Sequence, residues 1–435
     1  MKILSLTAGA ASMYCGSCLR DNALAAALLA RGHDVVLSPV YTPTRTDERN
    51  VSEQQVFFGG ISVFLEQHSA LFRHTPRALD RLWDSPWALR MASKRQIKVD
   101  PKSLGELTVS MLKGEQGFQA KEIAKMLDWL RLEPRFDIIV IPYSLLLGVA
   151  EPLKRELKVP LGCTLQGDDL FLDGLGAPYK QRSLDMIREA SRYVDGFFPV
   201  SEYYRDFMPS YLGINRDKMH VIPLGINMEG YAVREAKGAE TFTVGYFARI
   251  APEKGLHVLC DAYVRMRARL KAGKARLVAA GYLPPEHQGY LDAARATMRA
   301  AGYESEFEYR GEVDRTEKIR FLQGLDVLSV PTVYTEPKGM FLLEAMAVGV
   351  PVVQPRKGAF PEIVAKTGGG LIVDPDDPEA LAAGILALWR DRDRAAALGR
   401  AGAAGVREHY EVSRMAETAE AAYASVAKAA SRTAI

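Results

Sequence analysis

The sequence predicts an α/β fold of two Rossmann-like, doubly wound domains that face each other across a cleft. Strand-like apolar segments alternate with helical segments in two series, the first over 3–200 and the second over 242–353. Such alternation is typical of parallel sheets covered by helices. The length of 435 residues also favours two domains, because one hydrophobic core usually stops growing at roughly 250–300 residues.

A polar, helix-poor segment over 227–240 separates the two series. We place the domain boundary within it and expect an N-terminal domain over 1–232 and a C-terminal domain over 233–411. The Ala-rich tail has helical character and no strand of its own, so it must pack on a sheet that already exists. We expect its last part, 412–435, to return to the N-terminal domain as a helix.

The first forty residues predict a βαβ unit. An apolar strand at 3–6 is followed by a small-residue turn at 7–17, an Ala- and Leu-rich helix and a second strand at 34–37. A crossover this short implies adjacent parallel strands. The pattern loosens over 41–135 and becomes regular again at 136, so the intervening region is expected to be an elaboration of the first domain.

One part of this elaboration, 68–98, mixes aromatic, aliphatic and basic residues. Helices that lie in a membrane interface have this composition, which raises the hypothesis of peripheral membrane contact through 68–98. Pro76 and Pro86 interrupt the helix. Helical arms that only frame a cleft are therefore the alternative.

The composition excludes several classes of protein. The 56 basic and 53 acidic residues give a net charge of only +3, so no global field favours nucleic acid. Four cysteines are too few for a disulfide framework, and the N-terminus lacks the apolar stretch of a signal peptide. No apolar run approaches the ~20 residues of a membrane-spanning helix. We expect a cytoplasmic protein, whose oligomeric state the sequence does not reveal.

The sharpest chemical signal is Glu336-Pro-Lys-Gly-Met-Phe-Leu-Leu-Glu344. An extended run gives way here to a helix, so Gly339, Met340 and Phe341 are expected to present amide N–H groups at the helix start. Such groups and the helix dipole favour an anion. Glu336 stands before the helix and Glu344 lies inside it, so the two carboxylates can reach different parts of one ligand.

A second signal, Arg249-Ile-Ala-Pro-Glu-Lys254-Gly255, follows the strand that opens the second series. Two cations in a βα loop at the carboxyl edge of a parallel sheet lie where open α/β folds bind ligands, and they are suited to clamp a diphosphate. The alternative is that both are solvated loop residues and that Glu344 pairs with a neighbouring cation. The joint order of the two signals argues against chance.

These motifs resemble family 4 of the retaining, GT-B-fold glycosyltransferases over nearly the whole chain. The resemblance rests on the glycine-rich opening turn and the following segments: Ala27-Leu-Leu-Ala-Arg-Gly-His-Asp-Val35, Val221-Ile-Pro-Leu-Gly-Ile-Asn227, Phe247-Ala-Arg-Ile-Ala-Pro-Glu-Lys-Gly255, Gly311-Glu-Val313, and Glu336 to Glu344 continued by Ala345-Met-Ala-Val-Gly-Val-Pro-Val-Val353.

The resemblance implies a role for each of these positions. Arg249 and Lys254 would neutralise the diphosphate of a nucleotide-sugar donor such as a UDP- or GDP-sugar, and Glu336 would contact the transferred sugar. Glu344 would hold the ribose hydroxyls. The remaining donor contacts would come from Gly9 and Gly16 in the first domain and from Glu312, Val313, Gly339, Met340 and Phe341 in the second.

The implied chemistry needs no metal and no other cofactor. Cleavage of the anomeric bond leaves negative charge on the diphosphate, and fixed positive groups stabilise this charge as it develops. The family's retention of configuration is usually explained by attack from the same face, with the leaving phosphate accepting the proton of the acceptor hydroxyl. This mechanism asks the protein mainly for positioning.

Two positions depart from the family pattern. Gln166 stands where a histidine is common, and it cannot exchange a proton near neutral pH. Lys338 stands before Gly339, where an aromatic residue is more usual. Asp168 and Asp169 follow Gln166 and are candidates, with it, for the acceptor side of the site. A solvated loop pair is the alternative for the two aspartates.

Other functions stay open or are disfavoured by the sequence. A sugar-nucleotide epimerase of the same architecture and a catalytically silent nucleotide-sugar-binding homologue are the open alternatives. The first strand has no Gly-x-Gly-x-x-Gly after it, which argues against a dehydrogenase. Cys15-Gly-Ser-Cys18 has the spacing of a redox motif. We favour two small residues that allow close approach of the donor, because nothing nearby completes a metal site.

Overall fold

The computed structural model describes residues 1–9, 14–53, 56, 58–59, 63, 66–67, 101–234, 241–270 and 273–433. The chain forms two compact units. The first unit is Met1–Pro223 with Met415–Ile435, and the second is Leu224–Arg414. The expected membrane-contact region, 68–98, lies outside the described residues. Within the described part, no helix is both long and apolar enough to cross a membrane.

The units divide at Pro223, earlier than the expected boundary at 232. The segment after Pro223 is bonded to the second unit. Ile226 donates its N–H to the carbonyl of Tyr410 (2.9 Å) and accepts from the N–H of Val412 (3.0 Å). Arg315 donates to the carbonyls of Asn227 and Glu229. These bonds explain why a polar stretch that resembles a linker belongs to the second unit.

The first unit contains a parallel sheet with strand order β2-β1-β3-β4-β5. Its strands are β1 (Lys2–Thr7), β2 (Asp34–Pro39), β3 (Ile138–Ile141), β4 (Leu161–Leu165) and β5 (Gly196–Pro199). Its helices are α1 (Gly16–Ala30), α6 (Pro101–Leu112), α7 (Ala120–Leu132), α8 (Ala150–Leu157), α9 (Asp168–Gly174), α10 (Tyr179–Ala190), α11 (Glu202–Leu212) and α19 (Val412–Thr433). The order of strands changes direction between β1 and β3.

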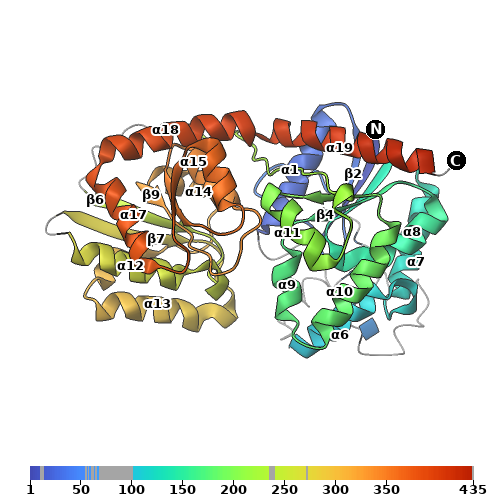
Figure 1. Cartoon of the computed structure of the whole chain (residues 1–435), viewed down its shortest axis with the longest axis horizontal. Coiled ribbons are helices and arrows are strands. Elements are labelled where there is room, and N and C mark those ends of the chain that lie inside the picture. The colour runs from blue at the N-terminus through green and yellow to red at the C-terminus, as the bar shows by residue number, and fades with distance from the viewer. Residues whose placement is uncertain are drawn as a thin grey trace. The chain divides into compact units, whose positions relative to one another are not determined.

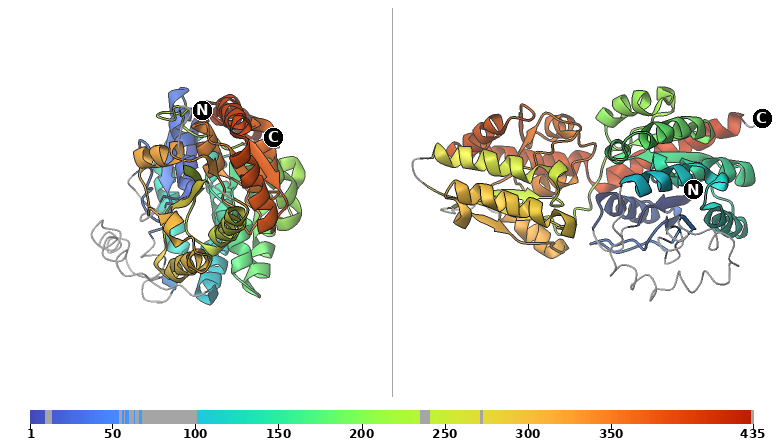
Figure 2. Two further views of the ribbon diagram at one scale, coloured as in Figure 1. Left: turned by 90° about the vertical axis from the view of Figure 1, so that its left-hand side faces the viewer. Right: turned by 90° about the horizontal axis from the view of Figure 1, so that it is seen from below.

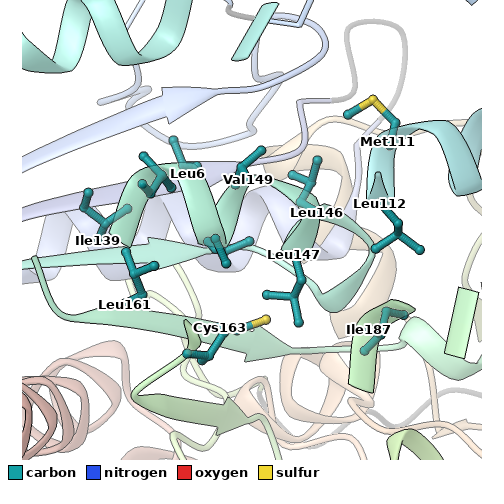
Figure 3. Close-up of a cluster of buried hydrophobic side chains, with 14 of the residues drawn as sticks. Leu6, Met111, Leu112, Ile139, Leu146, Leu147, Val149, Leu161, Cys163 and Ile187 are labelled. Carbon is teal, nitrogen blue, oxygen red and sulfur yellow. The ribbon is translucent and has the colours of Figure 1, made fainter. Parts of the chain in front are cut away.

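One large hydrophobic cluster of the first unit lies between this sheet and the helices on one of its faces. Figure 3 shows Ile139, Leu161 and Cys163 of the central strands packed with Leu147 and Ile187. The central strands are apolar on both faces, as expected for a sheet that is covered twice. Ser144–Val149 forms a 3-10 helix that precedes α8.

The C-terminal helix α19 packs on the first unit, and the views in Figures 1 and 2 agree on this placement. Arg31, at the end of α1, donates two hydrogen bonds to Glu420 at 2.9 and 2.7 Å. The ring of Tyr423 meets the ring of Phe198 from β5 edge-on at 4.9 Å. The tail therefore covers a sheet formed by residues far earlier in the chain.

The second unit contains a parallel sheet with strand order β11-β10-β9-β6-β7-β8. Its strands are β6 (Thr241–Phe247), β7 (Lys274–Ala280), β8 (Phe307–Tyr309), β9 (Val327–Leu328), β10 (Val352–Pro355) and β11 (Gly370–Val373). Its helices are α12 (Leu256–Ala268), α13 (Gln288–Ala300), α14 (Arg315–Gln323), α15 (Met340–Ala347), α16 (Phe360–Thr367), α17 (Pro378–Arg390) and α18 (Arg392–His409).

Helices cover both faces of this second sheet, as Figure 1 shows with α12 and α13 on one side and α14, α15 and α18 on the other. The order of strands changes direction between β6 and β9, which lie side by side. Ligands of open α/β sheets bind where the carboxyl ends of strands meet such a switch point. The loops after β6 and β9 are the ones that carry the charged motifs.

Candidate active site

Two glycines hold the charged loops of the second unit together. Gly255 has φ +76°, and a Cβ added there would lie 1.9 Å from the carbonyl oxygen of Pro331. Gly358 has φ +52°, and its added Cβ would lie 2.0 Å from the carbonyl oxygen of Glu336. Both the backbone conformation and the close approach require glycine. The loop after β9 is thereby held between the loops that follow β6 and β10.

This packing places Lys254 against Glu336. The Nζ of Lys254 lies 2.5 Å from Oε2 of Glu336 and donates to the hydroxyl of Tyr334 at 2.8 Å. Tyr334 also donates to Glu336. The side chain of Glu336 is 2% exposed and that of Lys254 is 17% exposed. The structure thus brings together two residues that are 82 positions apart in sequence.

The charges around Glu336 keep it ionised. Burial alone raises the pKa of its carboxyl, but the positive charges of Lys254 and Lys338 and the hydrogen bonds from Lys254 and Tyr334 outweigh burial and lower the pKa. The N–H of Lys338 donates to Oε1 at 3.2 Å. Lys338, one of the two departures from the family pattern, therefore adds positive charge at this carboxylate.

Helix α15 begins at Met340, directly after this pair. Its N-cap, Gly339, has φ +83°, and no side chain caps the helix. The N–H of Leu342 bonds to the carbonyl of Gly339. The ring of Phe341 lies 5.9 Å from Nζ of Lys254. The helix start thus lies beside a cation, an arrangement suited to an anion.

Glu344, inside α15, forms a second buried ion pair. Lys318 of α14 donates to Oε1 of Glu344 at 2.8 Å, and the hydroxyl of Tyr231 donates to the same oxygen at 3.3 Å. The side chains of Lys318 and Glu344 are 6% and 8% exposed. Glu344 therefore does pair with a neighbouring cation, as the alternative interpretation expected, but only through Oε1. No hydrogen bond from the described residues reaches the other oxygen, Oε2.

The other donor-binding candidates among the charged and apolar side chains of the second unit are Arg249, Glu312 and Val313. Arg249 pairs with Glu253 of its own loop, and its side chain is 39% exposed. Glu312 is exposed and Val313 half-buried, between β8 and α14. A capping box formed by Asp314 and Glu317 starts α14 directly after them, and this start places Lys318 on the face that meets Glu344.

In the first unit, Gly9 and Gly16 lie on either side of 10–13, which are outside the described residues. Gly9 has φ +75°, and a Cβ there would lie 1.7 Å from the carbonyl oxygen of Thr42. Gly16 is the first residue of α1. The close approach of two backbone segments within the first unit therefore requires glycine at position 9. This requirement does not depend on a bound donor.

The acidic pair after β4 is satisfied by its own unit. Asp168 accepts from the N–H and the hydroxyl of Ser144, both at 2.6 Å, and from the N–H of Gln166 at 3.0 Å. Asp169 accepts from the hydroxyl of Tyr204 at 2.6 Å. Burial raises the pKa of both aspartates despite these bonds. Neither is a solvated loop residue, which excludes that alternative.

Gln166 is also buried. Its Nε2 donates to the carbonyl of Pro142 at 3.0 Å. Its Oε1 is buried without a hydrogen-bond partner among the described residues, which is rare in native structures. The loop after β4 thus contains an amide with one unused acceptor, beside two aspartates whose oxygens already accept hydrogen bonds.

The sequence reasoning missed the residues that hold the carboxylates in place, namely Lys318, Tyr334 and Tyr231 in the second unit and Ser144 and Tyr204 in the first. The pattern Asp314-x-x-Glu317 was a signal for the start of α14. Nothing local marked Lys318 as buried, because its burial depends on the packing of α14 against α15. In the described ranges, no three His, Cys, Asp or Glu side chains are placed to hold a metal ion.

Two protein-family models match the chain. Residues 22–225 match the model of the glycosyl transferase 4-like domain, and residues 231–404 match that of glycosyl transferases group 1. Alpha-maltose-1-phosphate synthase of Mycolicibacterium smegmatis is 30% identical over 293 residues, which cover 63% of this chain and 72% of that protein.

A GDP-mannose-dependent alpha-(1-6)-phosphatidylinositol monomannoside mannosyltransferase of Mycobacterium tuberculosis is 29% identical over 218 residues. The match spans 49% of this chain and only about half, 53%, of that protein. Among solved structures, sucrose-phosphate synthase from Thermosynechococcus elongatus superposes with a TM-score of 0.72 at 17% identity, covering 98% of this chain and 99% of that one.

HepE of Anabaena in complex with UDP superposes with a TM-score of 0.68 at 18% identity, covering 98% of this chain and 100% of that one. Identities this low show the fold alone. Two parallel α/β units and the two domain models together define the class, and the chain belongs to family 4 of the GT-B-fold glycosyltransferases.

Proposed function

We propose that the protein is a retaining glycosyltransferase that moves a sugar from a nucleoside-diphosphate sugar to a hydroxyl acceptor, without a metal or other cofactor. The observation that carries the proposal is the pair of Lys254 and Glu336 beside the uncapped start of α15. A cation, a helix N-terminus and an ionised carboxylate there offer contacts to an anionic diphosphate and to the hydroxyls of a sugar.

In this proposal, Lys254 and the amides of Met340 and Phe341 receive the diphosphate. Their positive ends are fixed before the reaction, so they stabilise the leaving group as charge develops without costly reorganisation. Glu336 accepts hydrogen bonds from hydroxyls of the transferred sugar. When phosphate displaces the carboxylate as partner of Lys254, the Tyr334 hydroxyl still holds Glu336.

Glu344 is proposed to hold the ribose. Lys318 and Tyr231 both bind Oε1, so Oε2 keeps its acceptor capacity for the two ribose hydroxyls. A carboxylate that is already oriented loses less conformational freedom on binding a ligand. Arg249 would leave Glu253 to reach a phosphate, which an exposed ion pair permits at little cost.

A binding experiment can identify the nucleobase and the sugar of the donor. The mannosyltransferase named above is described as dependent on GDP-mannose, and HepE was solved with UDP. A GDP-sugar and a UDP-sugar both fit a site that recognises ribose, diphosphate and sugar hydroxyls. A thermal-shift screen of UDP-, GDP- and ADP-sugars identifies the donor, because a ligand that binds the native state raises the unfolding temperature.

The decisive assay incubates the protein with the donor so identified and measures free nucleotide and sugar products. Release of nucleotide that is lost in an Arg249→Ala, Lys254→Ala double variant supports transfer. An altered sugar still attached to nucleotide supports an epimerase instead. Binding without turnover, with or without candidate acceptors, supports a silent homologue. Turnover that survives the double change contradicts the assignment. The anomeric configuration of a transfer product tests retention.

A further inference from the structure

Two cysteines begin helix α1 in the first unit. Cys15 is the N-cap, with φ −103° and ψ 125°, and Cys18 lies one turn further on. Residues three apart at a helix start lie on one face. The interaction with Cys15 and the burial of the thiol raise the pKa of Cys18. Because α1 follows β1, the pair stands at the carboxyl edge of the first sheet, next to its switch point.

The two thiols differ in access. Cys18 is fully buried, whereas Cys15 is partly exposed. In redox-active Cys-x-x-Cys motifs an accessible thiol at a helix N-terminus attacks first, since the helix dipole favours its thiolate. A second, sheltered thiol then resolves the intermediate. By exposure, Cys15 corresponds to the attacking thiol and Cys18 to the sheltered, resolving thiol.

A buried acid lies behind the thiols. Asp21, one turn beyond Cys18 on α1, accepts from the hydroxyl of Thr7 at 3.0 Å and from Arg20 at 3.1 Å. Thr7 also acts on the Cys18 thiol, opposing the rise in its pKa that Cys15 and burial cause. Burial raises the pKa of Asp21 despite the charge of Arg20. The thiol pair is therefore linked through Thr7 to a carboxyl that can hold a proton inside the unit.

We propose that Cys15 and Cys18 form a reversible intramolecular disulfide by exchange with a low-molecular-weight disulfide. The Cys15 thiolate attacks the small disulfide, forming a mixed disulfide and releasing one small thiolate. The Cys18 thiol loses its proton, through Thr7 and Asp21 or to the departing thiolate, and attacks the Cys15 sulfur. The second small thiol leaves. The two protein thiols lose two electrons, and the small disulfide gains them.

The other cysteines serve as internal controls. Cys163 in β4 and Cys260 in α12 are each buried, and burial raises the pKa of both thiols, that of Cys260 to about 12. Neither has a second cysteine close by in its own segment. Buried thiols of this kind are inert toward exchange. They are expected to remain reduced where the Cys15 and Cys18 pair oxidises.

The test equilibrates the full-length protein in buffers with different ratios of reduced to oxidised glutathione. The reaction is quenched with acid, free thiols are alkylated after unfolding, and the peptides are quantified by mass spectrometry. We expect Cys15 and Cys18 to escape alkylation together at oxidising ratios and to become alkylated again after reduction. Cys163 and Cys260 should be alkylated throughout. No sugar donor is present, so the outcome is independent of the proposed transferase activity.

Two variants separate the roles of the thiols. Cys18→Ser should stop at a glutathione adduct on Cys15, formed at a rate close to that of the unmodified protein. Cys15→Ser should form an adduct at Cys18 at least about tenfold more slowly, because the remaining thiol is buried. Thermal unfolding of each variant confirms that it is folded. Full alkylation of both cysteines at every ratio, or equal reactivity of the two variants, overturns the proposal.

Discussion

The buried carboxylates of Glu336 and Glu344 in the second unit and of Asp168 and Asp169 in the first unit have different kinds of partner. In the second unit, Glu336 and Glu344 each face a lysine. In the first unit, Asp168 and Asp169 accept hydrogen bonds from Ser144, Gln166 and Tyr204. The positive charges near Glu336 outweigh its burial and lower its pKa. Burial raises the pKa of both aspartates.

Under the proposed function, this difference separates a ligand site in the second unit from a loop that is bonded within the first unit. A lysine that neutralises a buried carboxylate can exchange that partner for a phosphate. Asp168 accepts three internal hydrogen bonds and so has little acceptor capacity left for a ligand. Asp169 accepts one, from the hydroxyl of Tyr204. We therefore infer that Asp168 holds the loop after β4 in place, and that Gln166 and Asp169 keep acceptor capacity for a ligand.

The largest effect is expected from Lys254→Met. Loss of the fixed cation should reduce turnover about 100- to 1000-fold, as removal of one stabilising donor does in other active sites. The assay is nucleotide release at saturating donor. Lys180→Met is the matched control, since Lys180 pairs with Asp173 on the surface of the first unit. Equal activity of the two variants would remove Lys254 from the proposed mechanism.

The second effect concerns the pair formed by Lys318 and Glu344. Glu344→Gln should weaken nucleotide binding about 10- to 100-fold, because hydrogen bonds to a charged group contribute roughly 1.5–3 kcal/mol. Isothermal titration with the nucleoside diphosphate measures this change. Glu308→Gln, at an exposed ion pair with Arg310, is the control. Unchanged affinity in Glu344→Gln would mean that this carboxylate only stabilises the packing of α14 on α15.

Asp168→Ala should act on stability instead of nucleotide binding. The substitution leaves the buried N–H and hydroxyl of Ser144 without their acceptor, at a cost of about 1–3 kcal/mol each at most. Urea unfolding checks the loss, and titration checks that nucleotide affinity is retained. Asp173→Ala, at an exposed position, is the control. A stable Asp168→Ala protein with impaired transfer would make this aspartate an acceptor ligand.

The lowered pKa of Glu336 predicts a pH dependence of stability. The unfolded chain binds a proton at this carboxyl near its ordinary value of 4.5, whereas the folded protein resists protonation until a lower pH. The stabilisation is therefore present above about pH 4.5 and is lost as the pH falls through the folded pKa. Relative to Glu336→Gln, unfolding free energies of the unmodified protein should decline over this acid range. A parallel decline in both proteins would contradict the prediction.

The smallest effect is expected from Gln166→Leu. It removes one hydrogen bond to Pro142, but it also removes an unpartnered buried oxygen, so stability should change by less than about 1 kcal/mol. Urea unfolding measures this change. Comparison of nucleotide release with and without acceptor then shows whether Gln166 contributes to transfer. A large loss of stability would show that its Oε1 has a structural partner.

The sequence by itself determined the architecture and the position of the charged loops after β6 and β9. Strand and helix periods are local properties, so the two parallel sheets, the helical tail and the start of a helix after Gly339 were all predictable from residues close together in the chain. The same holds for the placement of Lys254 and Glu336 at strand ends. The irregular pattern over 41–135 gave no prediction of α6 and α7.

Only the tertiary structure decided which partners satisfy each buried group. Tyr231, Lys318 and Glu344 meet because three separate segments pack together, and no local pattern specifies such a meeting. The same is true of Asp168 with Ser144 and of the segment after Pro223, which joins the second unit through backbone bonds. Burying a polar group without a partner costs free energy, so the folded chain is most stable when these groups meet. Local sequence determines the helices and strands, but these contacts form only when the helices and strands pack.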